Sequence, residues 1–237
     1  IIHNAWKSAE PGVLFWDKIT SEAIPDLYGK GWKTVSTNPC GEIPLCPYDS
    51  CRLLSINLYS YVKNPFTDEA EFDYELFDEH SIYAQRFMDD IVDLEIEKID
   101  AILAKIITDP EDDYVKSVEV NLWKKVQEKA KQGRRTGLGI TAEGDMLAAL
   151  GIKYGTPSAT DFSENIHKRL AVNAYKSSII MAKERGAFDI WNYETEKDAP
   201  FLNRVLAEMD EQYVNMYKET GRRNIALLTI APNGTVS

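Results

Sequence analysis

Apolar residues recur at helical spacing in the first half of the chain. Between Tyr74 and Ile107 they fall at Phe87, Ile91 and Leu94 and continue through Ile99, Ile102, Leu103 and Ile106, which predicts one long helix or two. Asp109-Pro110 ends this pattern, since proline cannot continue a helix. A further helix is predicted up to Gly133 by apolar residues four apart, at Val118, Leu122, Val126 and Ala130.

Two helices are predicted in the second half. Asp161 to Arg185 places apolar side chains on or near one face and is followed by Gly186, a common residue just after a helix. Phe201 to Glu219 has a similar pattern and ends before Gly221. A brief helix is also expected from Asp145 to Leu150. The apolar members of the first face are Ile166, Leu170, Ala174, Ile179 and Met181.

Three short apolar runs read as buried strands: 53–62 (LLSINLYSYV), 136–141 (TGLGIT) and 224–230 (NIALLTI). Helices separate these runs, and we see no hairpin signals, so the pattern predicts an α/β fold in which helical crossovers join parallel strands. The segment Ile24 to Pro47 is rich in proline and glycine and is predicted to be a loop.

Composition and charge narrow the function. The 237 residues are 44% hydrophobic and 27% charged, as in a globular protein with a sizeable core. Acidic residues (38) outnumber Lys and Arg (27), and the net charge of -11 argues against a nucleic-acid-binding surface. No apolar run is long enough to span a membrane, and no signal peptide is evident, so we expect a cytoplasmic protein. A small anion can still be bound by backbone N–H groups.

The glycines of the second strand form a G-x-G-x-x-A pattern at Gly137, Gly139 and Ala142. This spacing occurs in dinucleotide-binding folds, where the glycines follow the first strand and open a helix. Here they lie within the strand, and a charged helix precedes them. We therefore predict that these glycines serve close packing of the strand.

All three cysteines fall within twelve positions, at Cys40, Cys46 and Cys51. An odd number without a secretion signal disfavours a disulfide framework and suggests thiol chemistry or a metal. A zinc site with His80 or His167 is the alternative, but the spacing lacks a C-x-x-C pair. We assign no metal ligand.

The strongest local signal is Asn38-Pro39-Cys40-Gly41-Glu42, which places a thiol, a carboxylate and an amide on one loop. If the loop is extended, alternate side chains face the same way, and Asn38, Cys40 and Glu42 point at one ligand. The motif taken alone favours a turn whose polar side chains are incidental.

Two further segments add to this signal. Cys51 opens the strand-like run, and at the other end of the chain the strand 224–230 leads into a Gly- and hydroxyl-containing turn. Such a turn presents free backbone N–H groups, a geometry that binds phosphate. The turn comprises Pro232, Asn233, Gly234, Thr235, Val236 and Ser237.

Taken together, these segments resemble the catalytic chain of ribonucleotide reductase. The resemblance rests on N-P-C-G-E-I-P-L (38–45), C-R-L-L-S-I-N-L (51–58), G-R-R-T-G-L-G-I-T-A-E-G-D (133–145) and A-P-N-G-T-V-S (231–237). It spans essentially the whole chain and is greatest for the adenosylcobalamin-dependent class II branch.

The resemblance implies a fold and a mechanism. The fold is a ten-stranded α/β barrel made of two parallel five-stranded halves, with a central finger loop at about residues 36–47. Cys40 would form a thiyl radical that abstracts the 3′ hydrogen of the ribose, Glu42 would act as general base, and Asn38 would hydrogen-bond the sugar. Cys51 would be one member of the reducing cysteine pair. The turn 232–237 would hold the substrate phosphates.

The resemblance also implies cofactors and partners. Adenosylcobalamin would supply the radical; in the class I alternative a separate metal-containing subunit does so. The substrate would be a ribonucleoside di- or triphosphate, with a thioredoxin-like reductant and, for the full protein, possible homodimerisation. No nucleic acid or membrane partner is expected.

The chain also departs from the family pattern. The partner of Cys51 is expected upstream of Ile1, and further barrel strands beyond Ser237, so we expect 1–237 to be an internal part of the catalytic barrel domain that depends on the remaining segments and is inactive alone. The first methionine, Met88, agrees with this expectation. Asn233 stands where threonine is more usual, and Cys46 is assigned no role.

Two interpretations from other classes stay open. A thiol redox or metal-binding protein predicts stoichiometric zinc or a functional Cys46–Cys51 disulfide. A helical interaction module predicts that Cys40→Ser leaves reductase activity of the full-length protein unchanged.

Overall fold

The structure, a computed structural model, describes residues 1–235. Its centre is a pair of parallel strands, β3 (Leu54–Asn57) and β6 (Leu138–Thr141), with Leu54 opposite Leu138 and Asn57 opposite Thr141. The helices α3 (Tyr74–Thr108) and α4 (Asp113–Gly133) connect the two strands. The predicted helical crossover between parallel strands is therefore confirmed.

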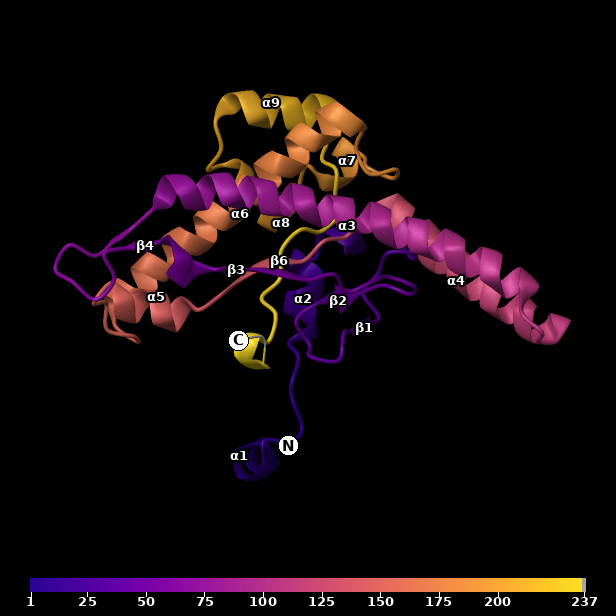
Figure 1. Cartoon of the computed structure of the whole chain (residues 1–237), viewed down its shortest axis with the longest axis horizontal. Helices are drawn as coiled ribbons and strands as arrows, with labels where there is room; N and C mark the ends of the chain where they lie inside the picture. The colour runs from indigo at the N-terminus through magenta and orange to yellow at the C-terminus, as the bar shows by residue number, and fades with distance from the viewer. Residues whose placement is uncertain (236–237) are drawn as a thin grey trace.

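The remaining elements surround this pair (Figure 1). Before β3 come α1 (Ile2–Ser8), α2 (Trp16–Glu22), the 3-10 helix η1 (Ile24–Tyr28), β1 (Ser36–Thr37) and β2 (Pro44–Leu45). Between β3 and α3 lie η2 (Leu58–Tyr61), β4 (Val62–Lys63) and β5 (Glu71–Phe72). After β6 follow α5 (Glu143–Ala149), α6 (Pro157–Arg185), α7 (Tyr193–Glu196), α8 (Pro200–Leu206), α9 (Glu211–Thr220) and η3 (Asn233–Thr235).

The segment from Tyr74 to Thr108 forms a single helix, and α4 returns beside its second half (Figure 1). Each helix begins at an aspartate whose side chain accepts a hydrogen bond from a first-turn N–H: Asp73 from Leu76 and Asp112 from Val115. Such caps satisfy backbone donors that the helix itself leaves free.

The apolar stripe predicted on α3 is only partly correct. Ile99 and Ile106 are buried, but Phe87 and Leu94 are 59% and 61% exposed. The inner face of this stretch instead buries Gln85 and Asp89, which hydrogen-bond to residues near β6. Apolar periodicity misidentified the face because polar side chains occupy part of the interior.

The predicted face of α6 is confirmed: Ile166, Leu170, Ala174, Ile179 and Met181 are all buried. Thr156 caps the helix, and Gly186, with a φ of 88°, follows its last residue. Most of this face joins the main core with Ile56, Leu138 and Ile140 of the two strands. The crossover helices and α6 thus hold β3 and β6 in place.

Two predicted segments are interrupted. The run 53–62 is a strand only to Asn57, whose side chain accepts from the Tyr59 N–H and begins η2. The segment 201–219 is two helices, because turn hydrogen bonds from Glu208 to Val205 and from Met209 to Leu206 end α8. Both helices then pack against α6 from different directions.

The predicted third strand, 224–230, runs alongside β6 without forming a regular strand. Its one ladder contact is a parallel bridge between Leu228 and Leu138, supported by the bonds from Leu138 N to Leu227 O (2.8 Å) and from Thr229 N to Leu138 O (3.0 Å). This segment nevertheless lies beside β6, as a third segment next to the two parallel strands.

The expectation of no hairpins was wrong. β1 and β2 pair antiparallel, as do β4 and β5. The strands in residues 1–235 form three two-stranded sheets and no closed barrel. None of the described helices has the length and apolar character needed to cross a membrane.

Gly139 of β6 and Gly137 directly before it serve close packing, as predicted. A Cβ on Gly139 would lie 2.1 Å from the carbonyl oxygen of Thr229, and a Cβ on Gly137 would lie 2.3 Å from that of Arg52. Real side-chain atoms do not approach backbone so closely. These two glycines let the segments before β3 and after α9 lie directly against β6.

Candidate active site

The candidate thiol lies at the tip of the β1–β2 hairpin. Ser36 pairs with Leu45 and Thr37 with Pro44, so residues 38–43 form the tip. The Gly41 N–H donates to the Asn38 carbonyl (3.0 Å), which closes a turn with Pro39 in its second position. Gly41 has a φ of 87°, a left-handed conformation that favours glycine.

This turn contradicts the expectation of an extended loop with alternating side chains. Asn38 is buried and Cys40 is exposed. The Asn38 side-chain oxygen accepts from the Ile43 N–H (2.9 Å), so the amide closes the hairpin tip from inside. The polar groups of the motif are therefore brought together by a turn.

The polar groups of the hairpin tip lie close to Cys51. The Asn38 amide donates to the Cys51 sulfur over 3.8 Å. Partial burial raises the pKa of the Cys51 thiol, and the nearby Glu42 carboxylate raises it further. The structure thus gathers Asn38, Cys40, Glu42 and Cys51 around the hairpin tip.

Glu42 carries a carboxylate whose two oxygens are buried and have no hydrogen-bond partner among residues 1–235. Its backbone carbonyl accepts from the Thr229 hydroxyl (3.3 Å), which ties the hairpin to the segment after α9. A carboxylate that is withdrawn from water and left unpaired is available to take a proton from a bound molecule.

We expect Glu42→Gln to stabilise the chain. A buried charge without partners costs more free energy than a neutral amide of the same shape, so the variant should raise the free energy of unfolding. Urea denaturation measures this change. The matched control is Glu95→Gln, which should destabilise the chain because the Glu95 carboxylate is paired with Arg52. A loss of stability in Glu42→Gln would contradict the assignment.

Cys46 is separated from this group. It is buried against Trp32, Phe188 and Ile225, and its thiol donates to Asp49 over 3.5 Å. Burial, with the Asp49 charge second, raises the pKa of the Cys46 thiol to about 12. At neutral pH Cys46 is therefore a protonated core residue, in agreement with the absence of an assigned role.

A set of ion pairs beside the base of the hairpin was not predicted from the sequence. The Arg135 guanidinium donates to Asp49 (2.6 Å), and Arg52 pairs with Glu95 and donates to the Arg135 carbonyl (2.7 Å). The available signal was the pair of arginines at 134–135 directly before a buried strand. Charged side chains in such a position are buried only when they are paired.

The terminal turn lies at the carboxyl ends of β3 and β6. The Asn233 side chain accepts from the Ser55 hydroxyl (3.1 Å) and donates to the Ile140 carbonyl. Asn233 therefore fastens the turn to both strands. Pro232 and Gly234 are exposed beside it. Two of the predicted phosphate-binding residues, Val236 and Ser237, lie outside the described residues.

An open pocket of about 440 Å³ adjoins this turn. Its lining includes Asn57 and Thr141 at the strand ends, Asn233 from the turn, and the acidic side chains of Glu143 and Asp145. Ligands of parallel α/β proteins commonly bind at this end of the strands.

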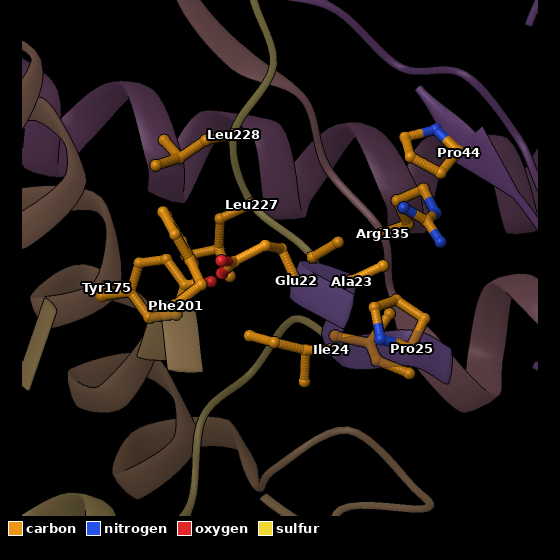
Figure 2. A pocket seen from close by; sticks show the side chains of 12 residues that line it. Glu22, Ala23, Ile24, Pro25, Pro44, Arg135, Tyr175, Phe201, Leu227 and Leu228 are labelled. Atoms are coloured by element: carbon orange, nitrogen blue, oxygen red, sulfur yellow. The ribbon is translucent and has the colours of Figure 1, made fainter. Parts of the chain in front are cut away.

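A second, smaller pocket of about 160 Å³ lies between the chain before η1, the base of the hairpin and the segment 225–228 (Figure 2). Ile24, Pro44 and Phe201 give it a largely apolar wall, and Arg135 also reaches it. It is lined by the base of the hairpin and by none of the three cysteines.

The other titratable clusters are engaged in structural contacts. Asp89, Asp90 and Asp93 lie close together, but Arg134 and Arg185 bind their carboxylates. The two histidines considered as zinc ligands lie away from the cysteines: His80 hydrogen-bonds with Tyr61, and His167 with Ser163.

Comparisons with known proteins match the whole chain. A family model described as the barrel domain of ribonucleotide reductase matches residues 1–237. The chain is 32% identical over its full length to the vitamin B12-dependent ribonucleoside-diphosphate reductase of Thermoplasma acidophilum and covers 24% of that protein. It is 29% identical over 238 residues to the protein of the same name in Mycobacterium tuberculosis strain H37Rv, of which it covers 26%.

A solved structure has a similar fold. The Actinobacillus ureae class Id ribonucleotide reductase alpha subunit superimposes with a TM-score of 0.62 at 22% identity, covering 99% of this chain and 35% of that one. The chain thus spans about a quarter of the length of the curated relatives it matches.

Proposed function

The chain belongs to the ribonucleotide reductase barrel domain family, and from this premise we propose that it supplies part of the active site that reduces ribonucleotides to 2′-deoxyribonucleotides. The observation that carries the proposal is the gathering of Asn38, Cys40, Glu42 and Cys51 at one hairpin tip. A radical thiol, a base, a hydrogen-bonding amide and a reducing thiol are the groups that this reaction requires.

The residues divide the work by their chemistry. Cys40, the exposed thiol, abstracts the 3′ hydrogen of the ribose as a thiyl radical and later returns it. The unpaired Glu42 carboxylate accepts the proton of the 3′ hydroxyl, and the 2′ hydroxyl leaves as water. Two electrons come from Cys51 and a partner thiol, which end as a disulfide, and a thioredoxin-like reductant restores them.

Cys40 fits the role of a group that exchanges hydrogen with a cofactor, because its thiol is exposed at the hairpin tip. When bound, adenosylcobalamin supplies the carbon radical that starts the chemistry. The B12-dependent relatives support this cofactor. The class I alternative, with a radical from a metal-containing subunit, uses the same thiol.

The finer architecture is part of the proposal. Residues 1–237 would form part of the catalytic barrel domain, with residues 36–47 as the finger loop of a ten-stranded barrel of two parallel halves. The parallel strands β3 and β6 and the hairpin between η1 and β3 support this arrangement.

The turn that begins at Pro232 is proposed to hold the substrate phosphates. Asn233 anchors the turn, and the backbone from Gly234 onward offers its N–H groups, with Thr235, Val236 and Ser237 completing the segment. Because Glu143 and Asp145 line the adjoining pocket, the phosphates are expected on the backbone side of the turn, away from these carboxylates.

Deoxyribonucleotide formation by the full-length protein tests the function. Purified protein is given a ribonucleoside di- or triphosphate and a dithiol, with adenosylcobalamin present or omitted. We expect product only with adenosylcobalamin. Product that instead requires an added metal-containing subunit would identify the class I mechanism, and no product in either condition would overturn the proposal.

A further inference from the structure

Two buried ion pairs flank Cys51 in the sequence. Two residues before it, the Asp49 carboxylate pairs with Arg135 at 2.6 Å, and these side chains are 2% and 6% exposed. Directly after it, Arg52 pairs with Glu95 of α3, and the Arg52 side chain is 4% exposed. Charges this deeply buried are retained only where the pairing geometry is good, so the flanks of Cys51 have well-defined positions.

The two pairs are joined through the backbone of Arg135. Arg52 donates to the Arg135 carbonyl (2.7 Å), and the Leu54 N–H donates to the Gly137 carbonyl (3.1 Å). Residues 49–54 are therefore fixed against 135–137, directly before β6.

The hairpin is connected to the same arginine, Arg135. The Asp49 oxygen that receives the Arg135 guanidinium also receives the Cys46 thiol, and Cys46 directly follows β2. Pro44 of β2 and Arg135 also line the same pocket (Figure 2). The hairpin carrying Cys40 and the segment carrying Cys51 thus meet at one buried guanidinium.

The charges around Cys51 come from two sides. Glu42 and Cys40 face it from the hairpin and disfavour its thiolate, while Arg135 faces it from the segment before β6 and favours the thiolate. The Asn38 amide also stabilises the thiolate by its hydrogen bond. Because the Arg135 side chain is withdrawn from water, its charge is screened less than that of an exposed arginine.

We propose that Arg135 is a positioning residue for Cys51: through Asp49 it holds the 46–51 segment against the hairpin, and it supplies the positive charge beside the Cys51 thiol. The redox significance of this role rests on the proposed function, since the thiolate is the form that takes part in thiol–disulfide exchange. The placement and the charge are properties of the chain itself.

Alkylation of a single thiol tests the proposal without any reductase assay. In the chain carrying Cys40→Ser, the rate of reaction with iodoacetamide as a function of pH gives the pKa of Cys51, because Cys46 is buried and burial raises the pKa of its thiol to about 12. Arg135→Gln is expected to raise this pKa, because it removes a positive charge that favours the thiolate. Arg135→Lys, which keeps the charge, should recover most of the shift. The control Arg86→Gln changes an exposed arginine paired with Glu184 and should leave the pKa unchanged.

The direction of the shift in the Cys51 pKa distinguishes the proposed role of Arg135 from a general loosening of the site. The pKa of Cys51 is already raised by burial, so a variant that merely opens the site would lower it toward the ordinary thiol value. Arg135→Gln must raise it. An unchanged or lowered pKa would overturn the proposal.

A second variant tests the proposal if Arg135→Gln does not fold. If Arg135→Gln does not melt cooperatively, the double variant Asp49→Asn/Arg135→Gln leaves no unpaired buried charge. It should show a smaller upward shift, because the Asp49 carboxylate is lost together with the guanidinium. Cys51→Ser in the full-length protein separates the two hypotheses. If turnover survives, the proposed role of Cys51 in catalysis fails while the alkylation result for Arg135 stands.

Discussion

Glu196→Ala is expected to lower the free energy of unfolding by about 3–5 kcal/mol, because it leaves a buried guanidinium without its counterion. Glu196 and Arg222 are both fully buried, and Arg222 donates to the two carboxylate oxygens over 2.5 and 2.9 Å. The hydroxyls of Tyr28 and Tyr217 donate to the same carboxylate over 2.7 and 3.0 Å. Removing the carboxylate therefore leaves four donor groups without an acceptor.

Thermal and urea denaturation measure the loss. For a chain of this size each kcal/mol corresponds to about 2–4 °C in Tm. The matched control is Glu184→Ala, which removes an exposed partner of Arg86 and should cost less than about 1 kcal/mol. The double variant Glu196→Leu/Arg222→Met should recover part of the stability, since it buries no unpaired charge but leaves the Tyr28 and Tyr217 hydroxyls without this acceptor. Equal losses in Glu196→Ala and Glu184→Ala would contradict the prediction.

The Glu196–Arg222 ion pair is also connected to the candidate active site. Arg222 begins the segment that runs along β6 to Thr229, whose hydroxyl contacts the hairpin at Glu42, and to the turn at Asn233. Tyr28 lies at the end of η1, before the hairpin. The loss of Glu196 is thus expected to loosen both arms of the candidate active site.

Helices with a simple apolar face could be predicted from the sequence. α6 is the clearest case, since every residue assigned to its face is buried. α3 was correct in extent but not in orientation, because its interior includes Gln85 and Asp89. Local periodicity carries no information about a buried polar side chain whose partners lie far away in the sequence, such as Arg134 for Asp89.

The candidate site, too, could be predicted only in part. The motif identified Asn38, Cys40, Glu42 and Cys51, and the structure gathers them. The expectation that alternation would align them was wrong, because Pro39 and Gly41 form a turn. The pairing of Arg135 with Asp49 could not be predicted, since 86 residues separate them and their contact exists only after the crossover is folded.

The most selective prediction for the reaction is that Cys40→Ser abolishes deoxyribonucleotide formation by the full-length protein. The replacement keeps size and hydrogen bonding, but an O–H bond is much stronger than the ribose C–H bond, so the exchange of a hydrogen atom with the sugar becomes unfavourable. Cys40 is exposed and makes no tertiary hydrogen bond in the described part of the chain, so folding and nucleotide binding should be preserved.

Cys46→Ala is the matched control, because it removes a neighbouring thiol that stays protonated up to a pKa of about 12 and is assigned no chemistry. Product formation measured at saturating nucleotide, with thermal melts of both variants, separates the loss of chemistry from the loss of structure. We expect turnover in Cys46→Ala and none in Cys40→Ser. Persisting turnover in Cys40→Ser would favour the non-catalytic interaction module, because a chain that only shapes or docks the enzyme does not need a thiol at the hairpin tip.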